Sequence, residues 1–228
     1  AEEMGRNTEL FYEKSAAFIE SAEKAGEPFY LIVNSHDPHR PYYKHTNEGK
    51  EITGRNGEPA SSHPSRVFHP DEVFVPKFLP DIPAIREELA DYYSSVRRCD
   101  DVVGRMLDLL DDKKIADSTI VIYLSDHGMA APSAKANAYL NSTKTPMIIR
   151  WPGQIKPGSV DSQNFVSIMD IFPTLLAAAH IKSPGGFDGV NLAPVFNGEK
   201  LADRGEIFFT QFYATIGKAQ FNMRTALT

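Results

Sequence analysis

The side chains in this 228-residue chain with most capacity for chemistry are an adjacent carboxylate and imidazole, Asp126 and His127. They follow a run of β-branched and aromatic residues, 119–124, and precede Gly128, which allows the backbone to turn. Such a run is typical of a buried strand, and open α/β sheets place their ligands at the carboxyl ends of strands. A neighbouring carboxylate and imidazole suit a divalent metal that accepts both oxygen and nitrogen. A turn in which Asp126 only caps the backbone is the alternative.

A second strand-like run, 28–34, also ends in polar side chains, the sequence His-Asp-Pro-His-Arg-Pro at 36–41. Burying such groups unpaired is costly, so their presence at a strand end favours a site over a core. The two prolines stiffen the loop and bias the residues before them toward an extended backbone. We therefore expect the loop to hold His39 and Arg40 in a fixed direction. A solvated loop with ordinary surface histidines is the competing interpretation.

Together these motifs resemble the sulfatase family of the alkaline phosphatase superfamily. The resemblance begins with the loop at 36–41 and continues with Ser125-Asp-His-Gly128 and Lys135. Three later segments follow in the family's order: Pro146-Met-Ile-Ile-Arg-Trp-Pro-Gly153, Val166-Ser-Ile-Met-Asp-Ile-Phe-Pro-Thr174 and Phe187-Asp-Gly-Val-Asn-Leu192. The resemblance spans roughly residues 28–200. Within the family, the path through 73–101 looks closest to sulfamidases, the heparan N-sulfatases.

The resemblance implies an α/β fold: an alkaline-phosphatase-like, mixed and mostly parallel sheet with helices on both faces, here incomplete. Family sulfatases hold a calcium ion with four side chains, and two of these ligands resemble Asp126 and His127. A hard, oxygen-preferring cation usually favours Asn over His at such a place. His127 therefore leaves Mn²⁺ or another divalent metal open beside Ca²⁺.

The resemblance also implies roles for four further side chains. His39 is similar to the family histidine that contacts the sulfate or protonates the leaving group, which suits an imidazole near neutral pH. Lys135 resembles the basic residue that binds a sulfate oxygen, where a point charge suffices. His36 is a further candidate for the substrate-binding site, and its alternative role is to support the residues that contact the substrate. Arg40 either orients the loop or contacts a substrate hydroxyl.

The nucleophile of the family is a formylglycine made from the first residue of a Cys/Ser-x-Pro-x-Arg motif. Ser62-His-Pro-Ser-Arg66 fits this pattern, but it follows His39, whereas the family motif precedes that strand. It also lies in a loop and not at the entrance to a helix that would stabilise an anion. Cys99 lies inside a predicted helix and is expected to be structural. We therefore expect the formylglycine segment, two metal ligands and a C-terminal region to be missing from this chain.

The elements that must position these residues alternate between helical and strand-like patterns. Helices are predicted over 7–24 (ending at Gly26), over 81–112 (capped by Asp81) and over 170–179 (capped by Asp170). Strands are predicted at 28–34, 118–124, 146–150, 206–213 and 221–225. The first strand, the long helix and the next strand predict a βαβ unit with parallel strands, which places His39 and Asp126 at one sheet edge.

One segment, residues 44–80, is rich in Gly, Pro, Ser, His and Asn and predicts a long excursion from the His39 strand. Long ordered loops tend to be functional, so we expect it to help select substrate or to be poorly ordered on its own. The whole chain, 1–228, is interpreted as the central to C-terminal part of one sulfatase catalytic domain.

Composition restricts the function further. The net charge of −6 and a pI near 5.7 argue against a general nucleic-acid binder, although a metal and a few cations still permit an anionic substrate. No stretch approaches the roughly 20 apolar residues of a membrane span, and no signal peptide is recognised. The family resemblance alone favours export to a periplasmic, secreted or lysosomal location. The single cysteine excludes an internal disulfide framework.

The leading hypothesis is part of a metal-dependent sulfatase that hydrolyses sulfate esters or sulfamates on a sulfated sugar, inactive as this chain alone. A phosphodiesterase or phosphomonoesterase of the same superfamily is one alternative, and a non-catalytic binding module is another. The upstream coding sequence would separate the three. Exposed sheet surface would favour self-association of the chain.

Overall fold

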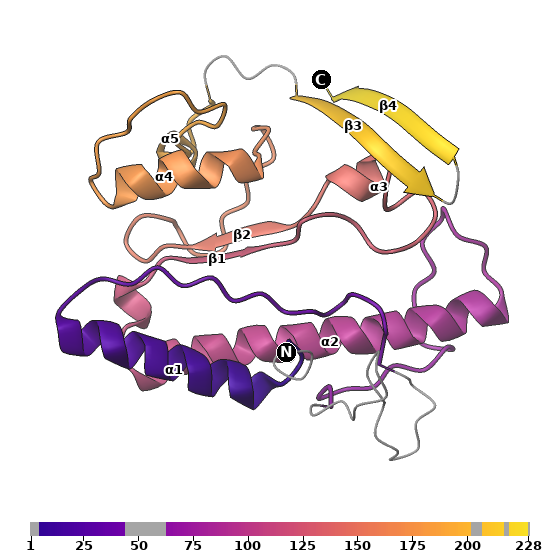
Figure 1. The fold of residues 1–228 in the computed structure, drawn as a ribbon, viewed down its shortest axis with the longest axis horizontal. Helices are drawn as coiled ribbons and strands as arrows, with labels where there is room; N and C mark the ends of the chain where they lie inside the picture. Colours follow the sequence, from indigo (N-terminus) through magenta and orange to yellow (C-terminus); the bar gives the residue numbers. More distant parts are fainter. Residues whose placement is uncertain (1–4, 44–62, 202–206, 217–218, 228) are drawn as a thin grey trace. The chain divides into compact units, whose positions relative to one another are not determined.

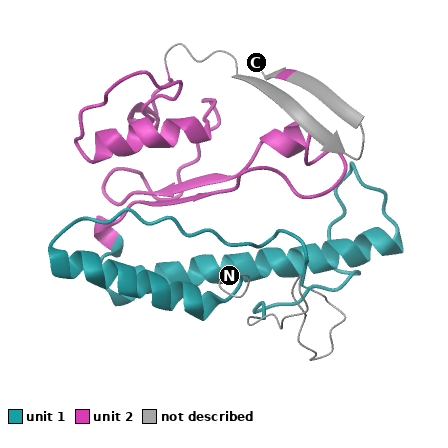
Figure 2. Cartoon of the chain, viewed as in Figure 1, with its two compact units in different colours: residues 1–116 teal, residues 117–228 magenta. Residues whose placement is uncertain are grey.

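The structure, a computed structural model, describes residues 5–43, 63–201, 207–216 and 219–227. The chain divides into two compact units, residues 1–116 and 117–228 (Figure 2). In the described residues, no helix has the length and apolar character needed to cross a membrane.

Unit 1 is built on two helices, α1 (Thr8–Ala25) and α2 (Pro83–Asp112), which pack against each other (Figure 1). The Asn7 side chain accepts a hydrogen bond from the Leu10 N–H at 3.0 Å and thereby caps the start of α1. Gly26 ends the helix in the left-handed region, at φ 71°. The helix predicted over 7–24 is therefore confirmed, together with its glycine stop.

The long helix predicted over 81–112 is also confirmed, but its predicted cap is wrong. Ile82 occupies the cap position without a side-chain hydrogen bond, and Pro83 begins the helix. Asp81 instead accepts hydrogen bonds from Arg86 Nε at 2.5 Å and Nη2 at 2.7 Å. A guanidinium satisfies both carboxylate oxygens at once, so it outcompetes a single backbone N–H.

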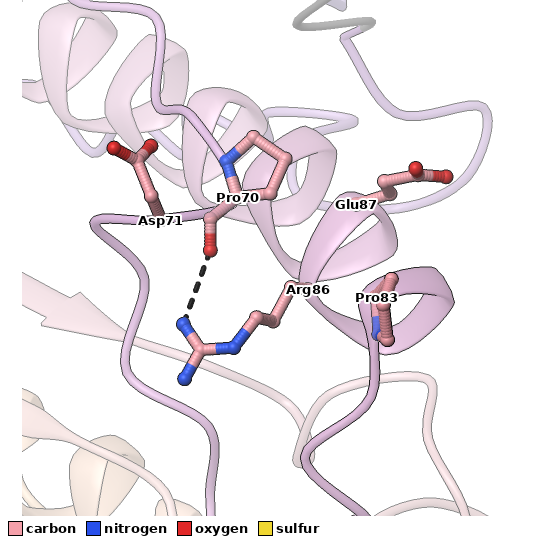
Figure 3. A pocket seen from close by; sticks show the side chains of 5 residues that line it. All are labelled: Pro70, Asp71, Pro83, Arg86 and Glu87. Carbon is pink, nitrogen blue, oxygen red and sulfur yellow. Dashed lines mark hydrogen bonds between the residues drawn. The ribbon is translucent and has the colours of Figure 1, made fainter.

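Arg86 also ties the segment before α2 to the helix. Its Nη1 donates to the carbonyl of Pro70 at 3.1 Å, as Figure 3 shows, and to that of Val73 at 3.4 Å. An open pocket of about 450 Å³ lies beside this contact and is lined by Pro70, Asp71, Pro83, Arg86 and Glu87. Because the Arg86 nitrogens are already bonded to Asp81 and to two carbonyls, the guanidinium is not free for an anion in this pocket.

The prediction of a strand over 28–34 is not met. Residues 27–36 form neither helix nor strand, and within the described part of unit 1 no hydrogen bond pairs the backbone of 28–34. The β-branched and aromatic composition of the stretch favours an extended backbone, but a strand also needs a neighbour to complete its ladder. Side chains alternate along the stretch, with Tyr30 and Ile32 exposed between the half-buried Phe29, Leu31 and Val33.

Unit 2 contains two antiparallel strand pairs. β1 (Val121–Leu124) pairs with β2 (Met147–Arg150), and β3 (Ile207–Ile216) pairs with β4 (Ala219–Leu227), as Figure 1 shows. The remaining elements are η1 (Ala116–Ser118, at the boundary of the units), α3 (Leu140–Thr143), η2 (Ile168–Asp170), α4 (Ile171–Ala178) and α5 (Ala193–Phe196). The predicted strands after residue 118 are therefore confirmed in position. The parallel βαβ unit is not formed among the described residues, whose two sheets are both antiparallel.

Asp170 joins the helical part of unit 2 to the loop that precedes α5. Its carboxylate is fully buried and accepts hydrogen bonds from the N–H groups of Ser167 at 2.7 Å and Val190 at 2.9 Å. Ser167 and Asp170 form a capping box on η2, which runs directly into α4. The helix predicted over 170–179 is confirmed as α4, but its predicted cap is wrong, because Asp170 makes no side-chain cap bond to α4 and instead completes the capping box of η2, whose N-cap is Ser167.

Candidate functional site

In unit 1, a buried ion cluster holds the loop at 36–41. The Asp37 side chain is fully buried and accepts hydrogen bonds from Arg98 Nε at 2.5 Å and Nη2 at 3.0 Å. Arg6 Nε lies 3.3 Å from the same carboxylate. Arg98 belongs to α2 and is only 1% exposed. A buried charge is tolerated only when it is paired, so this contact fixes the loop to the helix.

The backbone of His39 is held from two sides. Its carbonyl accepts a hydrogen bond from Arg6 Nη2 at 3.2 Å, and its N–H donates to the His36 carbonyl at 2.8 Å. His36 in turn donates its N–H to the Gly5 carbonyl at 2.8 Å. Gly5 must lack a side chain here, because a Cβ would lie 2.3 Å from the His36 ring. The expectation that this loop holds His39 in a fixed direction is therefore supported for the backbone.

The imidazole of His39 is exposed, and its Nδ1 lies 2.8 Å from the Arg40 carbonyl. A carbonyl only accepts, so Nδ1 is the donor in this contact and Nε2 stays available for proton transfer. The two proline peptide bonds of the loop, Asp37–Pro38 and Arg40–Pro41, are both cis.

The second half of the loop also follows α2. Arg40 forms an ion pair with Glu88, and its guanidinium lies 4.8 Å from the centroid of the Tyr42 ring. The Tyr43 N–H donates to Ser95 Oγ at 2.7 Å. Glu88, Ser95 and Arg98 follow one another at helical spacing, so a single face of α2 supports the loop.

The segment Ser62-His-Pro-Ser-Arg66, which resembles the family's nucleophile motif, is only partly described. Ser62 lies outside the described residues. His63 contacts the Tyr43 hydroxyl through Nδ1, and burial raises the pKa of Tyr43. Ser65 is bonded to Asp101 of α2 through both its N–H and its hydroxyl, each at 2.6 Å. Cys99, on the same helix, has a thiol pKa raised by burial, in keeping with its predicted structural role.

Asp126 and His127 follow directly after β1 in unit 2. The Asp126 side chain is 82% exposed, and its Oδ1 accepts the His127 N–H at 2.9 Å. His127 Nδ1 lies 2.7 Å from the Gly128 carbonyl and donates to it, so the lone pair of the neutral ring is on Nε2. Nε2 and Asp126 Oδ2 are 3.5 Å apart. Asp126 can therefore cap the backbone through Oδ1 and still offer Oδ2 to a metal ion.

These two donors fit part of a metal site. No group of three or more His, Cys, Asp or Glu side chains comes together within the described residues. A carboxylate oxygen and a neutral imidazole nitrogen are suitable ligands for Mn²⁺ and, less typically, for Ca²⁺. Two ligands alone leave most of the coordination sphere of either ion to other groups.

A tight turn continues from the Asp–His pair to Lys135. The Gly128 N–H donates to the Ser142 carbonyl at 3.1 Å, and a Cβ at Gly128 would lie 2.0 Å from the Asn141 carbonyl oxygen. Ser133 and Ala136 both have positive φ, 62° and 60°, on either side of the predicted sulfate-binding lysine. Such backbone strain in residues other than glycine is typical of functional loops. Lys135 is half-buried, and no described carboxylate forms an ion pair with it.

The predicted site residues therefore fall into two local groups. Unit 1 contains His36, His39 and Arg40, and unit 2 contains Asp126, His127 and Lys135. The common sheet edge for His39 and Asp126 stays a prediction. Sequence reasoning missed Arg6 and Arg98, which fix the histidine loop. The only sequence signal was a charged residue within the helical pattern of α2, and such residues are usually solvated.

The comparisons with known proteins agree with these motifs. Residues 2–181 match the family profile described as Sulfatase. N-sulphoglucosamine sulphohydrolase of Homo sapiens is 33% identical over 180 residues, covering 76% of this chain and 35% of that protein. Ulvan-active sulfatase of Formosa agariphila is 30% identical over 199 residues, covering 84% of this chain and 36% of that protein.

A solved structure of a protein in complex with its substrate D-glucosamine-2-N,6-O-disulfate has a TM-score of 0.71 at 20% identity. The match covers 98% of this chain and 59% of that one, and it confirms the predicted alkaline-phosphatase-like α/β class. The chain spans about a third of the length of the two curated relatives. Because the profile match covers most of its residues, the chain belongs to the sulfatase family.

Proposed function

We propose that this chain is part of a metal-dependent sulfatase that hydrolyses a sulfate ester or sulfamate on a sulfated sugar. The observation that carries the proposal is the local geometry of the Asp–His pair. The proton on His127 Nδ1 is bound to the Gly128 carbonyl, which leaves Nε2 and Asp126 Oδ2 as two free donor atoms 3.5 Å apart. Metal-binding histidines are typically oriented in this way by a carbonyl on the second ring nitrogen.

Asp126 Oδ2 and His127 Nε2 would hold a divalent cation, Ca²⁺ or Mn²⁺. When bound, the ion supplies positive charge that stabilises the sulfuryl oxygens during hydrolysis. We propose that the other ligands and the formylglycine nucleophile belong to the part of the relatives' length that this chain does not match.

Three side chains would act on the substrate directly. In its imidazolium form His39 would donate the Nε2 proton to the leaving group and return to the neutral ring, with Nδ1–H still bound to the Arg40 carbonyl. Lys135 would bind a sulfate oxygen as a point charge. Arg40 would contact the sugar, with His36 supporting the loop. Arg98 and Arg6 would keep the His39 backbone in place through Asp37.

The names of the relatives suggest which substrates to test first. One curated relative is named for N-sulphoglucosamine, and the solved neighbour binds a glucosamine disulfate. We propose an N- or O-sulfated glucosamine unit as the substrate class and an exported location for the enzyme. The exposed Tyr30 and Ile32 side chains, at 68% and 62%, also support self-association of this chain, which sedimentation velocity would measure.

A titration with Mn²⁺ tests the proposed metal ligands without requiring turnover. The paramagnetic ion should broaden NMR signals of residues 125–128 at low millimolar concentration. Asp126→Asn and His127→Ala should each abolish this broadening. His180→Ala, which removes another imidazole of unit 2, should leave it unchanged. Broadening that survives both site variants would contradict the assignment.

The upstream coding sequence separates the sulfatase from the alternatives. A Cys or Ser followed by x-Pro-x-Arg supports a sulfatase, and a lone Thr or Ser supports a phosphodiesterase or phosphomonoesterase. Neither would support a non-catalytic module.

A further inference from the structure

A row of aromatic rings in unit 1 has an arginine stacked on the ring at each end. The aromatic row consists of Tyr42, Tyr92, Tyr93 and Phe68, with successive centroid separations of 5.5, 5.8 and 5.8 Å. At one end the Arg40 guanidinium lies 4.8 Å from the Tyr42 centroid. At the other end the Arg66 guanidinium lies 4.4 Å from the Phe68 centroid.

Both terminal guanidinium groups are accessible. The side chains of Arg40 and Arg66 are 52% and 60% exposed. Each pairs with one exposed carboxylate, Arg40 with Glu88, and Arg66 with Glu72 at 3.3 Å. Exposed ion pairs contribute little net stability, and arginine has five N–H donors in all. A sulfate group can therefore bind each guanidinium beside its carboxylate or in place of it.

The aromatic row fixes the two cations relative to each other. The Tyr93 hydroxyl donates to the Phe74 carbonyl at 2.9 Å, and the Phe68 N–H donates to Ser94 Oγ of α2 at 2.9 Å. Stacking on a ring restricts the arginine side chain and is favourable for a guanidinium. Less side-chain entropy is then lost when a ligand binds. Two fixed cations separated by four rings match an elongated polyanion better than a single sulfate.

We propose that the aromatic row is a binding site for sulfate groups of an oligosaccharide, one at Arg40 and another at Arg66. The choice of ligand class rests on the proposed function, since Arg40 adjoins His39 in the candidate site. The row would extend binding of a sulfated sugar chain from Arg40, which contacts the substrate, to Arg66, which lies beyond the unit that is hydrolysed.

The test is calorimetric titration of the 228-residue chain with a sulfated glucosamine-containing tetrasaccharide, with its desulfated form as the ligand control. Arg40→Gln and Arg66→Gln should each weaken binding about three- to tenfold, the loss of one exposed charge-assisted contact. Glu88→Gln and Glu72→Gln should tighten it, because each removes a competing carboxylate.

Arg105→Gln is the matched control. Arg105 also lies on α2, stacks at 4.0 Å on the Tyr12 ring and pairs with Glu9, but it stands outside the aromatic row. Its replacement should leave binding unchanged. An equal loss in all three arginine variants, or equal binding of a single-stranded nucleic acid of the same charge, would show general electrostatics and overturn the proposal. Absence of binding would also overturn it.

This titration is independent of the proposed catalytic chemistry. The Mn²⁺ measurement reports on Asp126 and His127, and the oligosaccharide measurement reports on Arg40 and Arg66. Failure of one therefore does not produce failure of the other.

Discussion

Asp37 is the buried anion of the ion cluster in unit 1. Its fully buried carboxylate lies between Arg98 and Arg6, and Arg6 continues to the His39 carbonyl. The catalytic candidate is thus connected to α2 through a charge that has no access to water. This arrangement ties the loop at 36–41 to α2 through a buried charge.

Replacing this carboxylate by a neutral amide tests the ion cluster. In Asp37→Asn, two buried guanidinium groups lose their anion, and removing one partner of a buried pair typically costs about 3–5 kcal/mol. The free energy of unfolding, measured with urea, should fall by that order. Glu72→Gln, which removes an exposed carboxylate, should change it by less than about 1 kcal/mol. A similarly small change in Asp37→Asn would show that the cluster does not hold the loop.

At the scale of elements, Gly128 shows how closely the site loop approaches its neighbours. The turn after β1 brings Gly128 against the carbonyl oxygens of Asn141 and Ala134. A Cβ would lie 2.0 and 2.5 Å from these atoms, both of them backbone. The turn that presents the Asp–His pair therefore depends on a residue without a side chain.

Gly128→Ala should destabilise unit 2 by at least about 1–3 kcal/mol, because the backbone must move to relieve the contact. It should also shift the NMR signals of Asp126 and His127. Gly104→Ala is the matched control: it lies within α2 in open space and should stabilise the protein by about 0.5–1 kcal/mol. Equal thermal unfolding of the two variants would contradict this account of the turn.

The sequence predicted the helices correctly, because caps and apolar spacing within each segment determine where a helix forms. The helices at 8–25 and 83–112 have apolar spacing together with a capping asparagine, a terminal glycine or an initial proline. The stretch at 28–34 has the composition of a strand, but pairing depends on a neighbour that the sequence of the stretch does not specify. Asp81 was assigned to the wrong partner because Arg86, five residues away, offered a stronger one.

The same distinction applies to the candidate site. Asp126 and His127 were candidates from the sequence because a strand, a carboxylate–imidazole pair and a glycine follow one another in the chain. Arg98 contacts Asp37 across 61 positions, so no local pattern connects the two residues. A buried arginine inside a predicted helix is uncommon, and a functional reason for it appears only when its partner is known.

At the scale of the whole molecule, the chain carries two proposed metal ligands and proposed sulfate-binding cations, and no nucleophile is identified among the residues that the structure describes. The 228 residues correspond to about a third of the two curated relatives. Binding and catalysis can therefore be separated experimentally: sulfate recognition requires only cations, whereas turnover requires a nucleophile and a complete metal site.

We predict that the purified 228-residue chain has no sulfatase activity, with or without Ca²⁺ or Mn²⁺. Two ligands alone hold a divalent ion weakly. Without a nucleophile the covalent route to hydrolysis is closed, so substrate binding by His39 and Lys135 cannot restore turnover. Sulfate release from N-sulfated and O-sulfated glucosamine, followed by ion chromatography, should equal that of a buffer blank. Ser62→Ala is the informative variant, because Ser62 is the first residue of the sequence that resembles the nucleophile motif. Metal-dependent sulfate release that Ser62→Ala abolishes would make Ser62 the nucleophile and the chain an enzyme by itself.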